Sequence, residues 1–575
     1  MRRSLPFRRL TPAEKRLVAA YPAGEWVDVR EERQPTTWTG RITEAYESLT
    51  APAHRARSSS ATRTDHDPHE DAGASVENDG TDRADQVQVA PAARKRTPRA
   101  DRERVVRAEV IRALLLGVRP AEPGQVAAIR LIGARIVGDL DLSGAEVTAT
   151  LHLIRCQVDG VIDLVEAQTR ALRFRDCEIL RLRAGRARIN GVLDVGGSVL
   201  KEGIRLDNAH VSGQLRMSGC RLGCPGGWTS EDAGWSSARY PGDPREQDQK
   251  HTALWAGGLV VEGGAFLRGM TVTGGLRIQG ARFNGGLWLQ DTTIRATGRY
   301  AVHADYLQTT VMNMGEGFTA EGEISLRVAR ISGTLSFHGA RLTCTKGPVI
   351  QTRHLDVGEL LLTPESIEGG VDLGYTRVGL LADRPESYPG AVRLDGLVYE
   401  SLRSPATLRE RLAWLTKHPA GYRPQPYEQM AAYYRRMGHE PDSRRVLLAK
   451  QRARRRTLPP AGRAWGVLLD AVVGYGFRPW LAGAWLAALL TAGTLVFSLV
   501  PPVQISLDER PRHFNAFVYT LDHMVPVSLF EQRAAWEPTG WTIWVANALI
   551  AAGWILATAL IAGGTRVLRP ASTSP

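Results

Sequence analysis

The stretch LDLSGAEVTATLHLIRCQVDGVIDLVEAQTRALRFRDCEI, residues 140–179, decides the fold of this chain. Within it an apolar-x-apolar triplet alternates with a small residue, and each of the two returns every ten or eleven residues. An α-helix has no such period, whereas a stack of short strands does, because each coil places its inward side chains above those of the coil before. The small-residue series extends in both directions and comprises Ala134, Ala145, Cys156, Ala167, Cys177, Ala187, Ser198, Ala209 and Cys220.

The periodicity predicts an all-β fold, a right-handed parallel β-helix over residues 125–400 in which one coil comprises two of the short units. Past residue 253 the period lengthens to about 48 residues, so that Ala253-Leu-Trp aligns with Ala301-Val-His and Val349-Ile-Gln. We interpret each long repeat as two coils plus a side loop.

Side loops are expected at 296–318 and 344–366, next to an irregular excursion at 223–251. Loops that repeat in register project from one face of a solenoid, and that face is frequently the binding surface.

An open solenoid end exposes apolar side chains and edge backbone groups, so both ends need caps. Arg104–Leu116 is predicted to be a capping helix, and Thr11 with Pro12 predicts the start of a short helix nearer the N-terminus. At the other end, Tyr427–Gly438 and Ser443–Arg454 predict a helical hairpin that resembles a single tetratricopeptide unit. We expect this hairpin to dock on the last coil.

The charge of the chain is unevenly distributed. Its formal net charge is +13, and residues 401–480 contain 16 Lys and Arg against 5 Asp and Glu, while the repeat region is near neutral. A near-neutral solenoid argues against a nucleic-acid partner and against DNA mimicry. Residues 51–99 are polar and nearly free of large apolar groups, so they predict a disordered insertion, which contains the metal-ligand types Asp65, His66, Asp67, His69, Glu70 and Asp71.

The cysteines indicate packing more than catalysis. Cys156, Cys177 and Cys220 occupy the repeated small-residue position, where a thiol acts as a small hydrophobe. Cys220 and Cys224 form a C-x-x-x-C spacing, a weak redox or metal signal that has no matching second pair or histidine spacing and leaves open a thiol pair. The sequence has no G-x-G-x-x-G, Walker, G-x-S-x-G or H-E-x-x-H motif in the required context, so it predicts no catalytic, cofactor-binding or metal-binding residue.

Two uncharged apolar segments, 480–500 and 541–563, are each long enough to cross a bilayer, and tryptophans stand at their ends. Basic residues precede the first segment and follow the second, whereas the loop between them holds three Arg and five acidic residues. The positive-inside rule therefore predicts a two-span hairpin in the inner membrane, with both termini and the β-helix cytoplasmic.

The flanks of these segments predict contact with lipid. Residues 464–479 predict an amphipathic helix lying in the cytoplasmic interface. The loop 501–540 predicts a further amphipathic helix, interfacial or re-entrant; it lacks a Thr-Val-Gly-Tyr-Gly filter. The residues expected to contact anionic lipid are Arg452, Arg454, Arg455, Arg456 and Arg463.

The segments Val105–Leu116, Ile129–Ile136 and Leu140–Ala145, with Tyr427–Arg456 and Gly474–Trp480, resemble a bacterial family of actinobacterial type. Its members are pentapeptide-like β-helix proteins with a two-span membrane tail, commonly named "membrane-associated oxidoreductase". The resemblance implies the fold and the membrane tail, and it transfers no catalytic residue to this chain.

These observations favour a membrane-anchored cytoplasmic scaffold whose partners are membrane lipids and a protein, with a homo-oligomer left open. The alternatives are a membrane-associated oxidoreductase, as the family name implies, and a channel or transport accessory protein. The predicted organisation is an N-terminal cap at 1–50, the insertion at 51–99, a capping helix at 100–124, the β-helix at 125–400, the hairpin at 401–463, the interfacial helix at 464–479, spans at 480–500 and 541–563 around the loop 501–540, and a cytoplasmic tail at 564–575.

Overall fold

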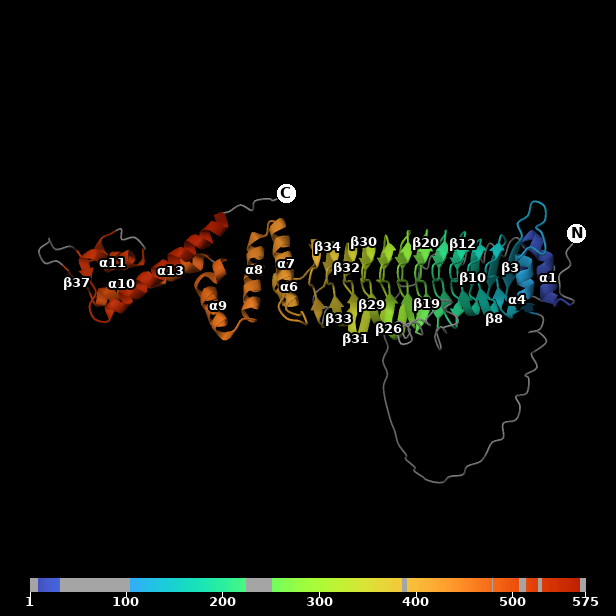
Figure 1. The fold of residues 1–575 in the computed structure, drawn as a ribbon, viewed down its shortest axis with the longest axis horizontal. Coiled ribbons are helices and arrows are strands. Elements are labelled where there is room, and N and C mark those ends of the chain that lie inside the picture. The colour runs from blue at the N-terminus through green and yellow to red at the C-terminus, as the bar shows by residue number, and fades with distance from the viewer. Residues whose placement is uncertain are drawn as a thin grey trace, which may run out of the picture.

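The computed structural model describes residues 9–30, 104–223, 251–384, 390–477, 479–505, 513–525 and 530–568. The molecule is a long rod (Figure 1), in which a parallel β-solenoid of about 11 turns is followed along the same axis by the C-terminal helices. The predicted insertion at 51–99, with its Asp and His cluster, lies outside the described residues.

Two parallel sheets form the walls of the solenoid. Sheet A contains β1 (Trp26–Asp28), β3 (Ala128–Ile132), β6 (Glu146–Val147), β7 (Thr150–Ile154), β9 (Gln168–Thr169), β10 (Leu172–Arg175), β12 (Arg188–Ile189), β13 (Leu193–Asp194), β16 (His210–Val211), β17 (Leu215–Arg216), β20 (Val260–Val261), β21 (Ala265–Phe266), β24 (Arg282–Phe283), β25 (Leu287–Trp288), β27 (Gln308–Thr309), β28 (Met312–Asn313), β30 (Arg330–Ser336), β32 (Asp356–Leu362), β34 (Arg377–Asp383) and β36 (Val398–Arg403). Sheet B contains β2 (Val105–Arg107), β4 (Arg135–Val137), β5 (Leu140–Asp141), β8 (Gln157–Asp163), β11 (Glu178–Arg183), β14 (Val199–Leu200), β15 (Ile204–Arg205), β18 (Arg221–Leu222), β19 (Thr252–Trp255), β22 (Thr271–Thr273), β23 (Gly275–Arg277), β26 (Thr293–His303), β29 (Thr319–Ser325), β31 (Arg341–Gln351), β33 (Ser366–Asp372) and β35 (Val392–Arg393).

The apolar series of the sequence forms the core. Leu151, Leu172, Leu193 and Leu215 pair in parallel register from coil to coil, and each is buried. Alternation along each strand turns the intervening residues outward, as the sequence predicts. Neighbouring coils are therefore about 4.8 Å apart along the rod, the ordinary spacing of hydrogen-bonded strands.

The long repeat also has the predicted composition. Trp255, Arg277, His303, Ser325 and Gln351 lie in one register of sheet B, so successive coils contain 22, 26, 22 and 26 residues. Two coils make up each 48-residue period, which confirms that interpretation.

The N-terminal cap differs from the prediction. Arg104–Leu116 is not one helix, because β2 first adds Val105–Arg107 to sheet B, and the helix α4 begins only at Ala108 and ends at Leu115. A second strand, β1, extends sheet A in the same way and pairs with β3. These strands satisfy the edges of the first coil that a helix alone would leave open.

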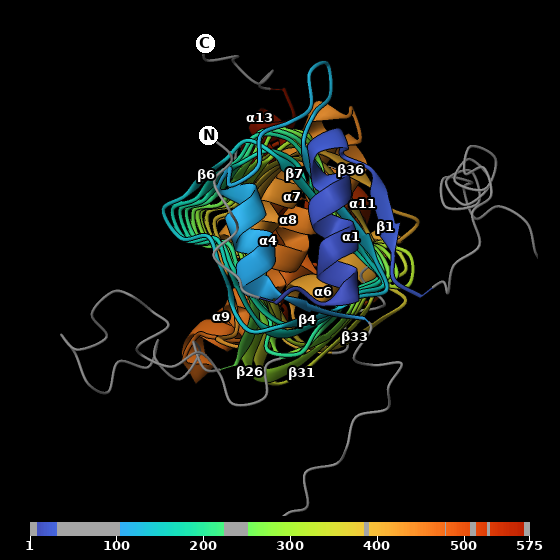
Figure 2. The same ribbon diagram turned by 90° about the vertical axis from the view of Figure 1, so that its right-hand side faces the viewer.

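The helix α1 (Pro12–Ala20), which the 3-10 turn η1 (Tyr21–Ala23) follows, lies across the solenoid end beside α4 (Figure 2). Thr11 caps α1 as predicted, in a capping box with Glu14. The buried Glu14 carboxylate also accepts from Arg107 Nε at 2.8 Å and so ties α1 to β2.

The C-terminal cap consists of α6 (Leu408–Leu415), α7 (Pro424–Arg436) and α8 (Glu440–Arg455). Side chains of α7 bind the exposed carbonyls of β36: Gln429 Nε2 donates to Tyr399 O at 2.8 Å, and Tyr433 Oη donates to Leu402 O at 3.3 Å. The predicted hairpin is therefore present, and it docks on the last coil.

Beyond the cap the chain contains α9 (Pro460–Val473), the 3-10 turn η4 (Gly474–Gly476), α10 (Pro479–Leu499), β37 (Val503–Gln504), α11 (Ala516–Met524), α12 (Gln532–Ala535), β38 (Trp536–Glu537) and α13 (Thr542–Leu568). Among the described residues one helix, α10, has the length and composition of a membrane span, over Trp480–Leu499. In α13 the described apolar stretch, Thr542–Thr558, is shorter than the length required of a candidate span. The first predicted span is thus present as a candidate, and the second is not confirmed.

Candidate functional site

The solenoid departs from regularity at one corner of sheet B. Compared with the neighbouring coils, β26 holds four extra residues between Arg295 and Val302, and β31 holds four between Thr343 and Ile350. The strand β18 ends and the strand β19 begins at the same corner, and residues 224–250 between them lie outside the described residues. We call this edge the insertion corner; β26 and β31 project there along one side of the rod (Figure 1).

The additions in β26 and β31 therefore lie on one face of the solenoid, and they are shorter than the predicted side loops. The predicted loops at 296–318 and 344–366 are too long, since most of each range belongs to regular strands such as β27 and β32. Only the four-residue additions project.

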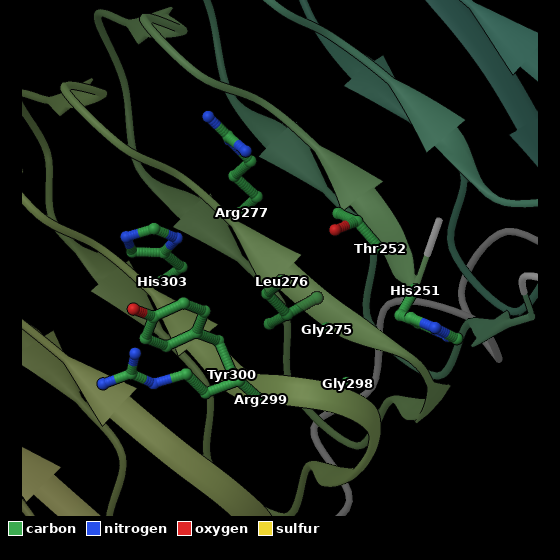
Figure 3. A pocket seen from close by; sticks show the side chains of 9 residues that line it. All are labelled: His251, Thr252, Gly275, Leu276, Arg277, Gly298, Arg299, Tyr300 and His303. Atoms are coloured by element: carbon green, nitrogen blue, oxygen red, sulfur yellow. The ribbon is translucent and has the colours of Figure 1, made fainter. Parts of the chain in front are cut away.

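A shallow cleft lies at the insertion corner (Figure 3), and its lining consists of His251, Thr252, Gly275, Leu276, Arg277, Gly298, Arg299, Tyr300 and His303. Its enclosed space holds about one water molecule. A cleft of this size does not enclose a small-molecule substrate, so we treat it as part of a surface.

Cationic and aromatic side chains stack in that surface. The Arg277 guanidinium lies 4.4 Å from the centre of the Trp255 ring. The rings of Tyr300 and His303 are stacked at 4.1 Å with an interplanar angle of 20°. Arg299 covers the other side of the tyrosine at 4.9 Å and binds the buried Glu323 carboxylate at 2.8 Å. The side chains therefore hold one another in place before any partner arrives.

The buried Asp305 carboxylate binds side chains of the next coil. Burial raises its pKa, but hydrogen bonds from His303, Arg327 and Ser325 outweigh burial and hold the pKa of this carboxyl well below its usual range. Ser325 Oγ donates to Asp305 at 2.6 Å and Arg327 Nε donates at 2.8 Å. Asp305 is thus ionised at neutral pH and orients the cationic face.

The structure describes one cysteine of the predicted thiol pair, Cys220, and the surroundings of this residue do not support a reactive thiol. Cys220 is fully buried, and its Sγ donates to Val195 O at 2.9 Å. Burial raises the pKa of this thiol to about 12, so it is not a thiolate at neutral pH. Cys224 lies outside the described residues. Within the described part of the chain no three His, Cys, Asp or Glu side chains are placed to hold a metal ion.

The second unusual surface is the outer face of α9. Its one acidic residue, Asp470, points toward α8 and accepts hydrogen bonds from Arg452 at 2.9 Å and Arg455 at 3.2 Å. Trp465 and Leu468 of the same helix are exposed. This is the reverse of the polarity of a helix on a soluble protein, which turns its apolar side inward.

The predicted anionic-lipid residues accordingly divide into two groups. Arg452 and Arg455 bind Asp470. Burial raises the pKa of that carboxyl, but the hydrogen bonds and charges of the two arginines outweigh burial and hold the pKa below its usual range. Arg454, Arg456 and Arg463 are exposed.

The apolar surface continues onto the last helices. Only 17% of the apolar window in α10 is buried. Exposed on α10 are Trp480, Trp485, Leu495 and Leu499, and exposed on or next to α13 are Trp541, Ile543, Trp544, Trp554 and Ile555. An apolar surface of this extent marks a membrane or protein contact.

The helix α11 packs against both α10 and α13. A Cβ at Gly493 of α10 would lie 2.5 Å from Thr520 Cγ2, and a Cβ at Gly553 of α13 would lie 2.1 Å from Met524 O. Glycine at these two positions lets α11 approach both helices closely. The predicted loop helix is therefore a packed element rather than a free amphipathic segment.

Comparison of the chain with protein-family models, curated proteins and solved structures gave no match. The family resemblance therefore stays a prediction. The evidence on function comes from the insertion corner and from the apolar surface of α9 and the last helices.

Proposed function

We propose that this protein is a membrane-anchored scaffold that presents its solenoid to a protein partner at the cytoplasmic face of the inner membrane. The observation that carries the proposal is the polarity of α9, in which Asp470 is bound inward by Arg452 and Arg455 while Trp465 and Leu468 face outward. Fully burying an apolar side chain contributes about 1.5–3 kcal/mol. A bilayer interface is the environment in which that contribution is recovered.

In this proposal α10 and α13 form the two-span hairpin, and α9 lies in the cytoplasmic interface. The exposed Arg454, Arg456 and Arg463 then lie at the level of lipid headgroups, where each basic residue contributes about 1 kcal/mol of attraction to an anionic leaflet. The loop between the helices holds three Arg and no Lys, fewer basic residues than the six Arg at 452–478 before the first span, and this bias supports placing the loop on the opposite side.

The insertion corner is the proposed docking face for the partner. Trp, Tyr and Arg are the side chains that most often dominate binding energy at protein interfaces. Here Trp255, Arg277 and Tyr300 lie together and are held by stacking and by the Glu323 ion pair. A rigid surface loses little entropy when a partner binds.

The docking face is tested by proximity labelling in cells. The variant Arg277→Ala with Tyr300→Ala removes the contact groups, and Arg216→Ala, an exposed residue of sheet A, is the matched control. The proposal predicts that a defined set of neighbours is lost in the double variant and retained in the control. Equal labelling patterns in all three proteins would remove this face from the proposal.

The oxidoreductase and transport alternatives stay predictions. The buried, protonated Cys220 argues against a thiol mechanism at that position. A visible absorbance spectrum of the full-length protein in mild detergent distinguishes the scaffold from the oxidoreductase. A stoichiometric flavin, haem or iron–sulfur band would favour the redox enzyme.

A further inference from the structure

Four successive coils carry bulky residues at a corner where the backbone favours glycine. Tyr306, Val328, His354 and Tyr375 have φ of 60°, 58°, 60° and 55°. They occupy equivalent positions, because each stands three residues after His303, Ser325, Gln351 and Asp372 in one register of sheet B. The coils next to them place Gly258, Gly280 and Gly396 there, and earlier coils place the polar residues Glu166, Arg186 and Asn208 there, all with positive φ. We call the four residues the corner stripe.

Within the chain His354 and Tyr375 stack on each other at 5.1 Å, yet the stripe stays open to solvent. Tyr306 is 61% exposed, Val328 is 42% exposed and Tyr375 is 55% exposed. A β-branched or bulky residue at positive φ is a backbone outlier, since its Cβ crowds the following carbonyl. What distinguishes the stripe is that its exposed side chains are mainly aromatic or apolar, and exposed apolar side chains gathered in one place indicate a contact outside the fold of one chain.

We propose that the corner stripe is the contact between two parallel copies of this chain, lying side by side with each coil against the same coil of its partner. The parallel orientation rests on the proposed membrane anchor. The C-terminal helices leave one end of the rod along its axis (Figure 1), so two copies in one membrane stand with their solenoids pointing the same way. A twofold axis along the rod then sets each stripe residue opposite itself.

The spacing of the stripe favours a second solenoid as the occupant. Its residues recur about every 4.8 Å along the rod, the strand spacing. Same-face residues recur about every 6.7 Å on an extended peptide, and a helix turn rises 5.4 Å. Over three intervals the peptide falls about 6 Å out of step and the helix about 2 Å, whereas another copy stays in register throughout.

The charges beside the stripe are compatible with this pairing. The twofold axis brings the residue just before the stripe in one copy opposite the residue two positions after the stripe in the other copy. We call these two residues the flanks of the stripe. On the His354 coil these are Asp356 and Arg353, which is already paired with Asp372 of its own chain at 3.5 Å. On the Val328 coil they are Arg327 and Arg330, and Arg327 is already paired with Asp305 of its own chain at 2.6 Å. On these two coils each flank therefore meets a partner of opposite or neutralised charge.

Cysteine cross-linking of the full-length protein in native membranes tests the proposal. In a background with Cys224→Ser and Cys344→Ser, Tyr306→Cys and Tyr375→Cys are each predicted to form disulfide-linked dimers on mild oxidation. The two positions are three coils, or about 14 Å, apart. Mixed differently tagged Tyr306→Cys and Tyr375→Cys chains should therefore give no hetero-linked product. Arg216→Cys, exposed on sheet A, is the control that should stay monomeric.

Further variants and outcomes test the parallel dimer and the membrane anchor separately. Adding Val328→Gly and His354→Gly to Tyr306→Cys relieves strain, so the chain still folds, and cross-linking should fall at least tenfold. Hetero-linked product would show an antiparallel pair and overturn the parallel arrangement. Chains that fractionate with membranes but do not cross-link overturn the dimer alone, whereas soluble chains overturn the anchor.

Discussion

The ion pair that fastens the C-terminal cap gives a quantitative prediction. Arg411 of α6 is 1% exposed and Asp383 of β34 is 0% exposed. Arg411 Nη1 donates to Asp383 Oδ2 at 3.0 Å, and Nη2 donates to Oδ1 at 2.5 Å. Replacing Arg411 with Met removes the cation that binds both oxygens of this buried carboxylate. Breaking such a pair costs about 3–5 kcal/mol.

Because a solenoid is stabilised by contacts between neighbours, the loss should be local to the cap. Hydrogen exchange of peptides from α6, α7 and α8 measures it. We expect their opening free energy to fall by about 3–5 kcal/mol, which is a rise in exchange rate on the order of a hundredfold or more. Strands in the middle of the solenoid, such as β16 and β20, should exchange as in the parent protein.

Two controls separate the charge effect from loss of packing. Arg411→Met combined with Asp383→Leu replaces the pair with apolar groups, and buried pairs replaced in this way are often neutral or more stable. Arg403→Met removes an exposed partner of Glu359 at 3.8 Å and should cost less than about 1 kcal/mol. The reasoning is wrong if the single Arg411 variant loses less than about 1 kcal/mol, or if the double variant is as damaged as the single one.

Three further predictions concern single side chains. Burial, then the charges of Arg173, Arg175 and Arg130, lower the pKa of His152 to about 4, so the unfolded chain takes up the extra proton between pH 6.5 and about 4. Stability should therefore fall as the pH drops through that window, and His152→Phe should reduce that loss in melting temperature. Cys220 should resist maleimide in the native protein and react only after denaturation, whereas rapid native labelling would contradict its burial. Val328→Gly should stabilise the solenoid by about 1 kcal/mol in thermal unfolding, because it relieves a β-branched residue at positive φ, and a lower melting temperature would show that the strain argument is mistaken.

Periodicity made most of the solenoid predictable. The Leu-x-Leu and small-residue series specify the inward side chains, as the register of Leu151, Leu172 and Leu193 shows. The 48-residue period predicted paired coils with an addition at one corner. Apolar run length predicted α10, and the spacing of Trp465 and Leu468 predicted an amphipathic α9.

Features that depend on contacts between distant residues could not be read from the sequence. Val105–Arg107 belongs to an apolar run of helical period, and its strand form depends on pairing with β4. Arg452 and Arg455 belong to a basic run, and only the approach of α8 to α9 assigns them to Asp470. The corner stripe had a signal, since Tyr306, Val328, His354 and Tyr375 align with Gly258 and Gly280 once the coils are in register.

Membrane anchoring with a cytoplasmic solenoid is the central claim, and cysteine accessibility in intact cells tests it most directly. Single cysteines are introduced at Ala420, in the C-terminal cap, and at Thr539, before α13; both residues are exposed. We predict that the chain stays with membranes through an alkaline carbonate wash. A membrane-impermeant maleimide should label Thr539→Cys from outside and should label Ala420→Cys only after permeabilisation. Release by carbonate, or labelling of Ala420→Cys in intact cells, would contradict the account.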